Sequence, residues 1–471
     1  MMARLIICST LLIAFTLPSV ADAADSAHVI PVGYTAINAG YASLQDEASK
    51  NSTGELSMLK PPPVSDEPDL ASIDVGCAES CGPTGCCPDL WTRDDFLRLG
   101  QFYVQGWVDQ GFTLNPASPE NRFNTPVGFN DRSNDYQMNQ LYLVMGRRPN
   151  TEGCKFDYGA RVDLLYGSDY YYTTAAGLET YSNGVTQRWN TTGPRAGGTA
   201  ALYGLAMPQL YAEFYLPWRY GTTVKVGHFN TILGYESVMA PQNFFYSHSY
   251  MMIYGEPKTH TGFLASYQYA PRLTFHAGMT RGWDSWEDPT DRAGFLGGVS
   301  WSSCDGRTNV NFAISSGDEH VGGESNRTVY SLVLMQQLNC RWTYVFQQDY
   351  GVQDNGYIDS QFTRVPARWY GISQYLFYAM SDVTSLGFRF EWFRDEENSR
   401  VLALPIAGAA TGKNYYEATL GINWHPSPRF TVRPEVRWDW SDVTPARNNG
   451  MYNDFLDKNQ FTFATDLVFV F

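Results

Sequence analysis

Hydrophobic and polar positions alternate in many short segments from about residue 95 to the C-terminus. In residues 156–166 the even positions are apolar or aromatic, whereas Asp157, Arg161 and Asp163 all lie at odd positions. Residues 430–440 repeat this pattern, with charged residues only at alternate positions. Because successive side chains of a β-strand point to opposite faces, each segment is predicted to be a strand with one apolar and one polar face.

The connections between these segments indicate where the strands lie. Seven short connectors, such as 270–272 and 425–429, alternate with eight longer polar stretches, such as 167–207 and 351–366. Aromatic residues also gather at the ends of the apolar faces, as at Trp438 and Trp440. Short turns on one side, long loops on the other and aromatic girdles are typical of outer-membrane barrels. A soluble β-sandwich has no reason to place every long loop at one end.

Fifteen connections predict a transmembrane antiparallel up-and-down β-barrel of about 16 strands over residues 95–471, although counts of 14 and 18 are also open. The first strand is predicted near 97–108. Residues 1–23 read as a signal peptide, because an apolar run follows Arg4 and an Ala-Asp-Ala motif ends it. Residues 24–94, rich in proline and poor in large apolar residues, are predicted to be a flexible periplasmic segment.

Cysteines favour an oxidising compartment. Four lie at 77, 81, 86 and 87, where disulfides fit better than a zinc site because no histidine is close. Cys304 and Cys340 fall in adjacent short turns and are predicted to form a disulfide, while Cys154 could tether the N-terminal segment. No metal site is expected.

The net charge of −15 argues against nucleic acid as a partner and is compatible with a preference for cations. No hydrolase, metalloprotease, phosphate-loop or dinucleotide motif occurs, so no enzyme and no cofactor is expected.

Charged residues on the polar face of the strands are the candidates for lining a pore, since mixed charges on a pore wall sort ions. The alternative is that they pair across strands and fill the interior. The candidates are Asp157, Arg161, Asp163, Glu213, Lys225, Arg389, Glu391, Glu417, Arg433, Glu435, Arg437 and Asp439.

The long connection 230–259 is expected to fold into the lumen, because it carries more aromatic residues than an exposed loop usually does. It offers Glu236, His248 and Lys258 as candidates for lining a constriction. The alternative is that its aromatic residues pack on the barrel rim or at a trimer contact.

The chain also resembles a known family over about residues 95–471, most specifically in three segments. Residues 224–250 and 260–262 are similar to the bacterial outer-membrane β-barrel porins of the OmpL-like group, and so is the opening strand 106–116. The similar positions are Gly227, Phe229, Thr231, Gly234, Tyr235, Glu236, Asn243, Phe244, Tyr246, Ser247, Tyr250, His260, Thr261 and Gly262. The resemblance implies an outer-membrane barrel that forms a pore, and it names no solute.

The chain ends on Phe471, within a strand whose aromatic face is predicted to meet lipid and whose Asp466 is predicted to face the lumen. Replacement of Asp466 by leucine is therefore expected to be mild. Phe469 and Phe471 resemble the C-terminal signature that the barrel-assembly machinery recognises, and we expect them to serve as an assembly signal.

The sequence thus predicts a porin of the bacterial outer membrane, with its N-terminal segment in the periplasm, that lets small hydrophilic solutes or ions diffuse passively. Its expected partners are membrane lipid, the assembly machinery and these solutes, and a homotrimer is one assembly open to it. The alternative function is a non-conducting structural or adhesion barrel that links envelope layers.

Overall fold

The computed structural model describes residues 102–471, except 152–154, 196–197, 288–289, 291, 320–324 and 404–408. The predicted signal peptide, the whole predicted N-terminal segment 24–94 and Cys154 lie outside the described residues. The described chain contains no helix that is long and apolar enough to cross a membrane.

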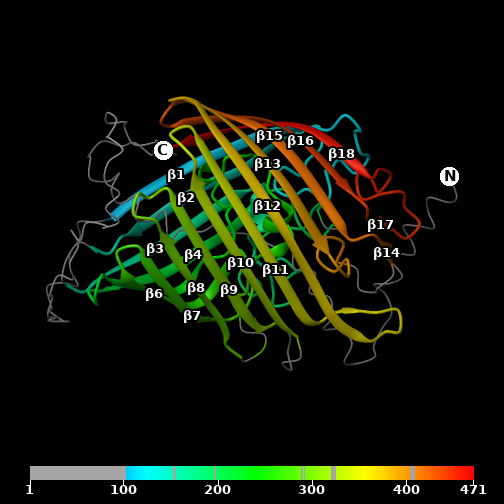
Figure 1. The fold of residues 1–471 in the computed structure, drawn as a ribbon. Coiled ribbons are helices and arrows are strands. Elements are labelled where there is room, and N and C mark those ends of the chain that lie inside the picture. Colours follow the sequence, from blue (N-terminus) through cyan, green and yellow to red (C-terminus); the bar gives the residue numbers. More distant parts are fainter. Residues whose placement is uncertain are drawn as a thin grey trace.

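Sixteen antiparallel strands close into one barrel (Figure 1), which confirms the predicted fold and strand number. The barrel strands are β1 (Phe102–Leu114), β2 (Asp135–Arg147), β3 (Asp157–Gly167), β4 (Gly204–Leu216), β5 (Thr222–Asn230), β6 (Thr259–Ala270), β7 (Leu273–Thr280), β8 (Gly294–Ser302), β9 (Thr308–Asp318), β10 (Asn326–Gln337), β11 (Trp342–Ile358), β12 (Arg364–Ser381), β13 (Thr384–Asp395), β15 (Asn414–Ser427), β16 (Phe430–Ser441) and β18 (Asn459–Val470).

The remaining elements are small. Strands β14 (Ala410–Thr411) and β17 (Thr444–Pro445) lie in the connections that follow β13 and β16, and they pair with each other in a separate two-stranded sheet. The short helical turns are η2 (Ser168–Tyr172), η4 (Ala240–Gln242) and η5 (Met251–Gly255), the last of which is a π-helix.

The barrel closes between its first and last strands. Trp107 pairs with Val470, and the register runs on to Leu114 opposite Phe463. The backbone N–H of Phe471 donates to the Gly106 carbonyl, and the Gly106 N–H donates to the Phe471 carbonyl. The chain therefore ends within a ladder whose hydrogen bonds are satisfied, and neither strand is left as an open edge.

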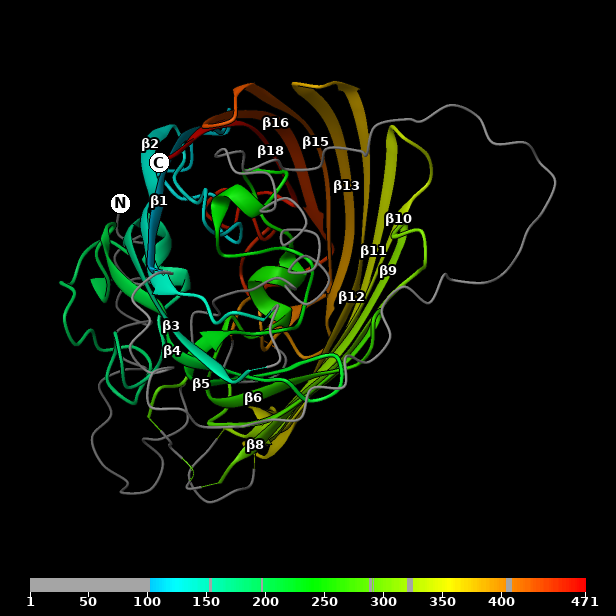
Figure 2. The same cartoon turned by 90° about the vertical axis from the view of Figure 1, so that its left-hand side faces the viewer.

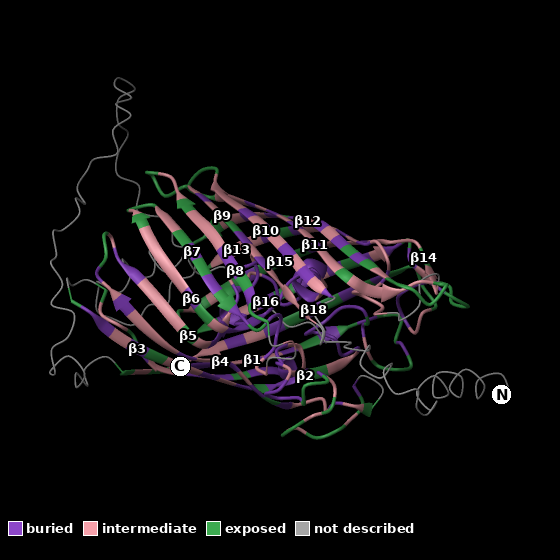
Figure 3. Ribbon diagram, turned by 90° about the horizontal axis from the view of Figure 1, so that it is seen from below, coloured by how far each residue is buried: buried purple, intermediate pink, exposed green. Residues whose placement is uncertain are grey.

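Buried and exposed positions alternate along the strands (Figure 3), as the sequence pattern predicts. In β16 the charged residues at 433, 435, 437 and 439 are buried, whereas Trp438 is 47% exposed. The apolar faces thus point outward and the charged faces point into the barrel, which suits a barrel surrounded by lipid.

Two predicted boundaries were wrong. The first strand begins at Phe102 and runs to Leu114, further along the chain than the predicted 97–108. The predicted long loop 351–366 is mostly strand, because β11 runs to Ile358 and β12 begins at Arg364. The pairs Tyr357–Val365 and Ile358–Arg364 extend this hairpin. The polar sequence of this hairpin is compatible with strand pairing. Outside the membrane, two strands need only hydrogen bonds between their backbones, and neither face has to be apolar.

The predicted disulfide between Cys304 and Cys340 was also wrong. Cys340 is a free, exposed thiol in the turn between β10 and β11. Cys304 is disulfide-bonded, so its partner is not Cys340. Placing two cysteines in neighbouring turns is therefore not enough to join them, because the bond also needs the correct separation and direction of the two side chains.

Candidate functional site in the barrel lumen

The connection between β5 and β6 lies inside the barrel. Figure 2, which looks along the barrel, shows its helical turns within the ring of strands. We call this connection, residues 231–258, the inner loop. Its placement follows from its composition, because large apolar side chains such as Met251 and Ile253 are buried there rather than left in water.

Apolar side chains of the inner loop pack against strands around the lumen. Leu233 and Met251 belong to a buried cluster that reaches Leu264 on β6, Leu296 on β8 and Phe393 on β13. A second cluster contains Val238, Met239 and Met252 together with Trp107 on β1 and Tyr142 on β2. The inner loop therefore crosses the lumen instead of following one side of it.

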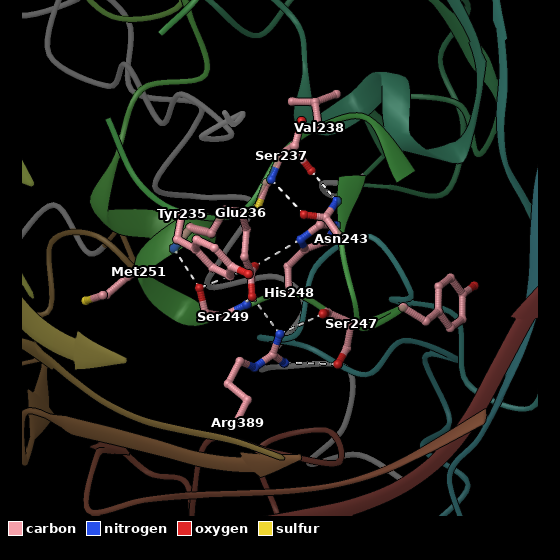
Figure 4. Close-up of polar contacts among 12 residues, drawn as sticks. Tyr235, Glu236, Ser237, Val238, Asn243, Ser247, His248, Ser249, Met251 and Arg389 are labelled. Carbon is pink, nitrogen blue, oxygen red and sulfur yellow. Dashed lines mark hydrogen bonds and ion pairs between the residues drawn. The ribbon is translucent and has the colours of Figure 1, made fainter. Parts of the chain in front are cut away.

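An ion-paired cluster fixes the middle of the inner loop to the wall (Figure 4). Arg389 on β13 donates from Nη1 to Glu236 Oε1 at 2.7 Å and from Nη2 to Ser247 Oγ at 3.0 Å. Glu236 Oε2 accepts from the Ser249 backbone N–H at 3.0 Å and lies 3.1 Å from His248 Nδ1. Tyr375 on β12 donates its hydroxyl to Glu236 Oε1 at 3.1 Å.

These contacts change the acidity of Glu236. Burial alone would raise the pKa of this carboxyl, but the charge of Arg389 and the hydrogen bond from His248 lower the pKa to about 2. The carboxylate is therefore charged at neutral pH although it is buried. An ion pair in this setting fixes the loop in place, because removing either partner would leave a buried charge alone.

Other wall charges bind the backbone of the inner loop. Glu391 accepts from the Tyr250 and Met251 N–H groups, the latter at 2.6 Å, and Glu435 accepts from the N–H groups of Tyr246 and Ser247. Carboxylates thus satisfy backbone donors that are buried in the lumen and cannot reach water.

Two wall arginines bind backbone carbonyls. Arg433 donates to the Ala240 and Asn243 carbonyls, both at 2.8 Å. Arg437 donates to the His248 carbonyl at 2.5 Å and pairs with Asp439 at 2.7 Å. Wall residues of β13 and β16 thus supply both donors and acceptors to one irregular backbone segment.

The twelve candidates for lining a pore lie in two regions of the wall, one formed by β13, β15 and β16 and the other by β3, β4 and β5. Those on β13, β15 and β16 are buried, and they contact the inner loop or one another. Asp157 and Asp163 pair with Arg147 and Arg161. Partly accessible side chains are found at Arg161 on β3, Glu213 on β4 and Lys225 on β5. Their role in permeation stays a prediction.

The three candidates for a constriction are all buried. Glu236 and His248 are 5% and 4% exposed, and Lys258 is fully buried. Lys258 donates from Nζ to the carbonyls of Ile253 and Glu256 at 3.4 and 3.1 Å. These side chains hold the inner loop together or to the wall, and whether they also meet permeating ions stays a prediction.

Sequence reasoning missed several residues that hold the inner loop. Gln347 on β11 accepts from the Tyr235 N–H, and Trp369 on β12 donates to the Gly255 carbonyl at 2.9 Å. Tyr250 donates its hydroxyl to Asp439 at 2.7 Å. Alternation could have placed Gln347 and Trp369 on the inner face of their strands, but it carries no signal for the loop atoms that they bind.

Known proteins place this architecture in a family. The family model described as "Putative beta-barrel porin-2, OmpL-like" matches residues 101–471. The chain belongs to this porin family. No curated protein sequence matches this porin.

Solved structures support the same fold. The porin resembles the outer membrane channel DcaP of Acinetobacter baumannii with a TM-score of 0.50 and 8% identity, covering 79% of this chain and 97% of that one. An anion-selective porin from Comamonas acidovorans gives a TM-score of 0.48 and 9% identity, covering 79% and 99%. At 8% identity, the similarity to DcaP shows that the two proteins share a fold and shows nothing about function. We draw no conclusion from the similarity to the Comamonas porin.

Family and fold together indicate an outer-membrane barrel of the channel-forming type. In the part of the chain that the structure describes, no group of three or more His, Cys, Asp or Glu side chains is placed to hold a metal ion.

Proposed function

We propose that this porin is a narrow outer-membrane channel for passive diffusion of small hydrophilic solutes or ions. The observation that carries this proposal is the inner loop, which crosses a 16-strand lumen and is held by wall charges. A barrel of this strand number is too wide for its own side chains to fill. The inner loop, rather than the wall, would then set the size limit for solutes.

A preference for cations is a finer part of the proposal. It is supported by the net charge of −15, which comes from 48 Asp and Glu against 33 Lys and Arg. Such a surplus of carboxylates would favour cations in a narrow passage. The reversal potential across a salt gradient measures this preference, and a potential of the sign for anions would contradict it.

The test of conduction uses the full-length mature porin in planar bilayers. We expect small single-channel steps for the native protein. A variant in which residues 234–255 are replaced by a short Gly/Ser linker should give steps several-fold larger, because the material that crosses the lumen is removed. A matched control replaces residues 182–187, in the outer connection between β3 and β4, by the same linker and should leave the steps unchanged.

The second candidate function is a non-conducting structural barrel, and the burial of the inner loop against strands around the lumen favours it. The two candidates make different predictions for the same experiment. If the native porin gives no steps but the linker variant conducts, the inner loop closes the barrel and the structural function is supported. Equal steps for native and linker proteins would overturn the idea that the inner loop limits passage.

A further inference from the structure

The lipid-facing surface of β11 and β12 carries polar side chains in an apolar setting. These two long strands lie side by side in the barrel wall (Figure 1). Gln348 on β11 and Gln374 on β12 have the outward parity of their strands, because their neighbours Gln347, Asp349 and Ser373 are buried in the lumen. The side chain of Gln374 is on the exposed surface of the barrel.

Aromatic girdles show that both glutamines lie at the depth of the hydrocarbon. On the inner-leaflet side, the rings of Trp342 and Tyr378 lie against each other with their centroids 4.6 Å apart. On the other side, Tyr350 stacks with Tyr370 at 5.9 Å. The span from 342 to 350 is roughly 26 Å along the strand, which after tilting fits an apolar band of about 25 Å. Gln374 is midway between the two girdle residues of its own strand.

The amide groups are only partly satisfied within one chain. Gln374 Oε1 accepts from the Tyr344 hydroxyl at 2.8 Å, and Gln348 Nε2 donates to the Asp349 carbonyl at 2.8 Å. Among the described residues, Gln374 Nε2 has no hydrogen-bond partner. Acyl chains offer neither donors nor acceptors, so an amide facing them would remain unsatisfied.

We propose that this surface, defined by Tyr344, Gln348 and Gln374, is where a second copy of the chain docks. An amide is both donor and acceptor, so the Nε2 of Gln374 in one copy can donate to the Oε1 of Gln348 in another. This chemistry favours a second copy over lipid. The free, exposed thiol of Cys340 lies in the turn that leads into β11, at one end of the same surface. The inference rests on the membrane location and is independent of conduction.

Cysteine cross-linking in native outer membranes tests the surface. Gln374→Cys is made in a Cys340→Ser background, and the membranes are treated with copper phenanthroline, which oxidises two thiols to one disulfide. We expect a covalent dimer of this chain on a non-reducing gel. Leu420→Cys on β15 and Leu141→Cys on β2, in the same background, are the outward-facing controls, because these side chains are 45% and 42% exposed. Cross-linking at either control equal to that at Gln374 would overturn the proposal, as would adducts with a different protein only.

A second measurement covers the chance that cysteine disturbs packing. The double variant Gln348→Leu, Gln374→Leu keeps an apolar surface and should insert normally, as judged by heat-modifiable migration on a gel. Native mass spectrometry of the detergent-extracted protein should then show a shift from oligomer to monomer. An unchanged oligomer, or a native protein that is monomeric from the start, would refute the proposed docking surface.

Discussion

Arg389 and Glu236 are 153 positions apart in the sequence, yet their side chains form an ion pair at 2.7 Å in which neither is more than 5% exposed. One belongs to the wall and the other to the inner loop. Their pairing converts a long connection of the barrel into a fixed element of the lumen, and it makes the position of that element sensitive to single substitutions.

Replacing Arg389 by methionine should loosen the inner loop. The substitution leaves Glu236 and Glu417 buried without their shared partner, and breaking a buried pair in this way costs about 3–5 kcal/mol. We expect larger and noisier single-channel steps and a lower temperature for heat modification on gels. Arg364→Gln, at the exposed start of β12, is the control and should match the native porin. Native-like steps in the Arg389 variant would show that the pair does not fix the loop.

Replacing Asp466 by leucine should be damaging, contrary to the mild effect that the sequence predicts. Asp466 is fully buried and forms a salt bridge with Arg433, whose other contacts hold the inner loop. After the substitution, Asp109 is the only salt-bridge partner left to the Arg433 guanidinium among the described residues, and its Oδ2 lies 3.9 Å from Arg433 Nη2. A loss of about 3–5 kcal/mol is expected. Folded yield after refolding into detergent measures it, with Thr465→Leu on the lipid side as control; equal yields would contradict this reasoning.

The C-terminal aromatic residues should be needed for assembly. The Phe469 ring lies against the Phe430 ring on the outer surface, with the centroids 4.7 Å apart, and Phe471 exchanges two backbone hydrogen bonds with Gly106. Phe469→Asp or deletion of Phe471 should therefore lower the amount of porin inserted in outer membranes several-fold. Phe362→Asp, in the outer turn between β11 and β12, is the control because that ring is 77% exposed. Normal insertion of the truncated chain would argue against an assembly signal.

Acid should release the inner loop only at very low pH. The pKa of Glu236 is about 2, below its ordinary value near 4.5. A carboxyl whose pKa is lowered by folding stabilises the folded state above the unfolded pKa, and this contribution is lost as pH falls from about 4.5 towards 2. Glu236 stays charged between pH 7 and pH 5, so we expect the size of the single-channel steps to be constant over this range. In Glu236→Gln the acid-induced change should disappear, and its persistence would assign it to another group.

Sequence reasoning was most reliable where one physical rule acts along each strand. The alternation around Arg433 and Glu435 gave the inward face of β16, because lipid excludes charges from the outer face. It was least reliable at connections, where the rule does not apply. The loop expected at 351–366 is a paired hairpin, and Cys304 and Cys340 are not joined, since both outcomes depend on the relative placement of separate segments.

The sequence by itself determined that strands of this kind must form a membrane barrel of about 16 strands with charged residues inside. The reason is local: each side chain's polarity sets the face to which it belongs. Only the tertiary structure decided what those charges do. Glu236, Tyr250 and Ser247 reach Arg389, Glu391 and Glu435 across the lumen, and no spacing in the sequence encodes a contact made between a folded loop and the opposite wall.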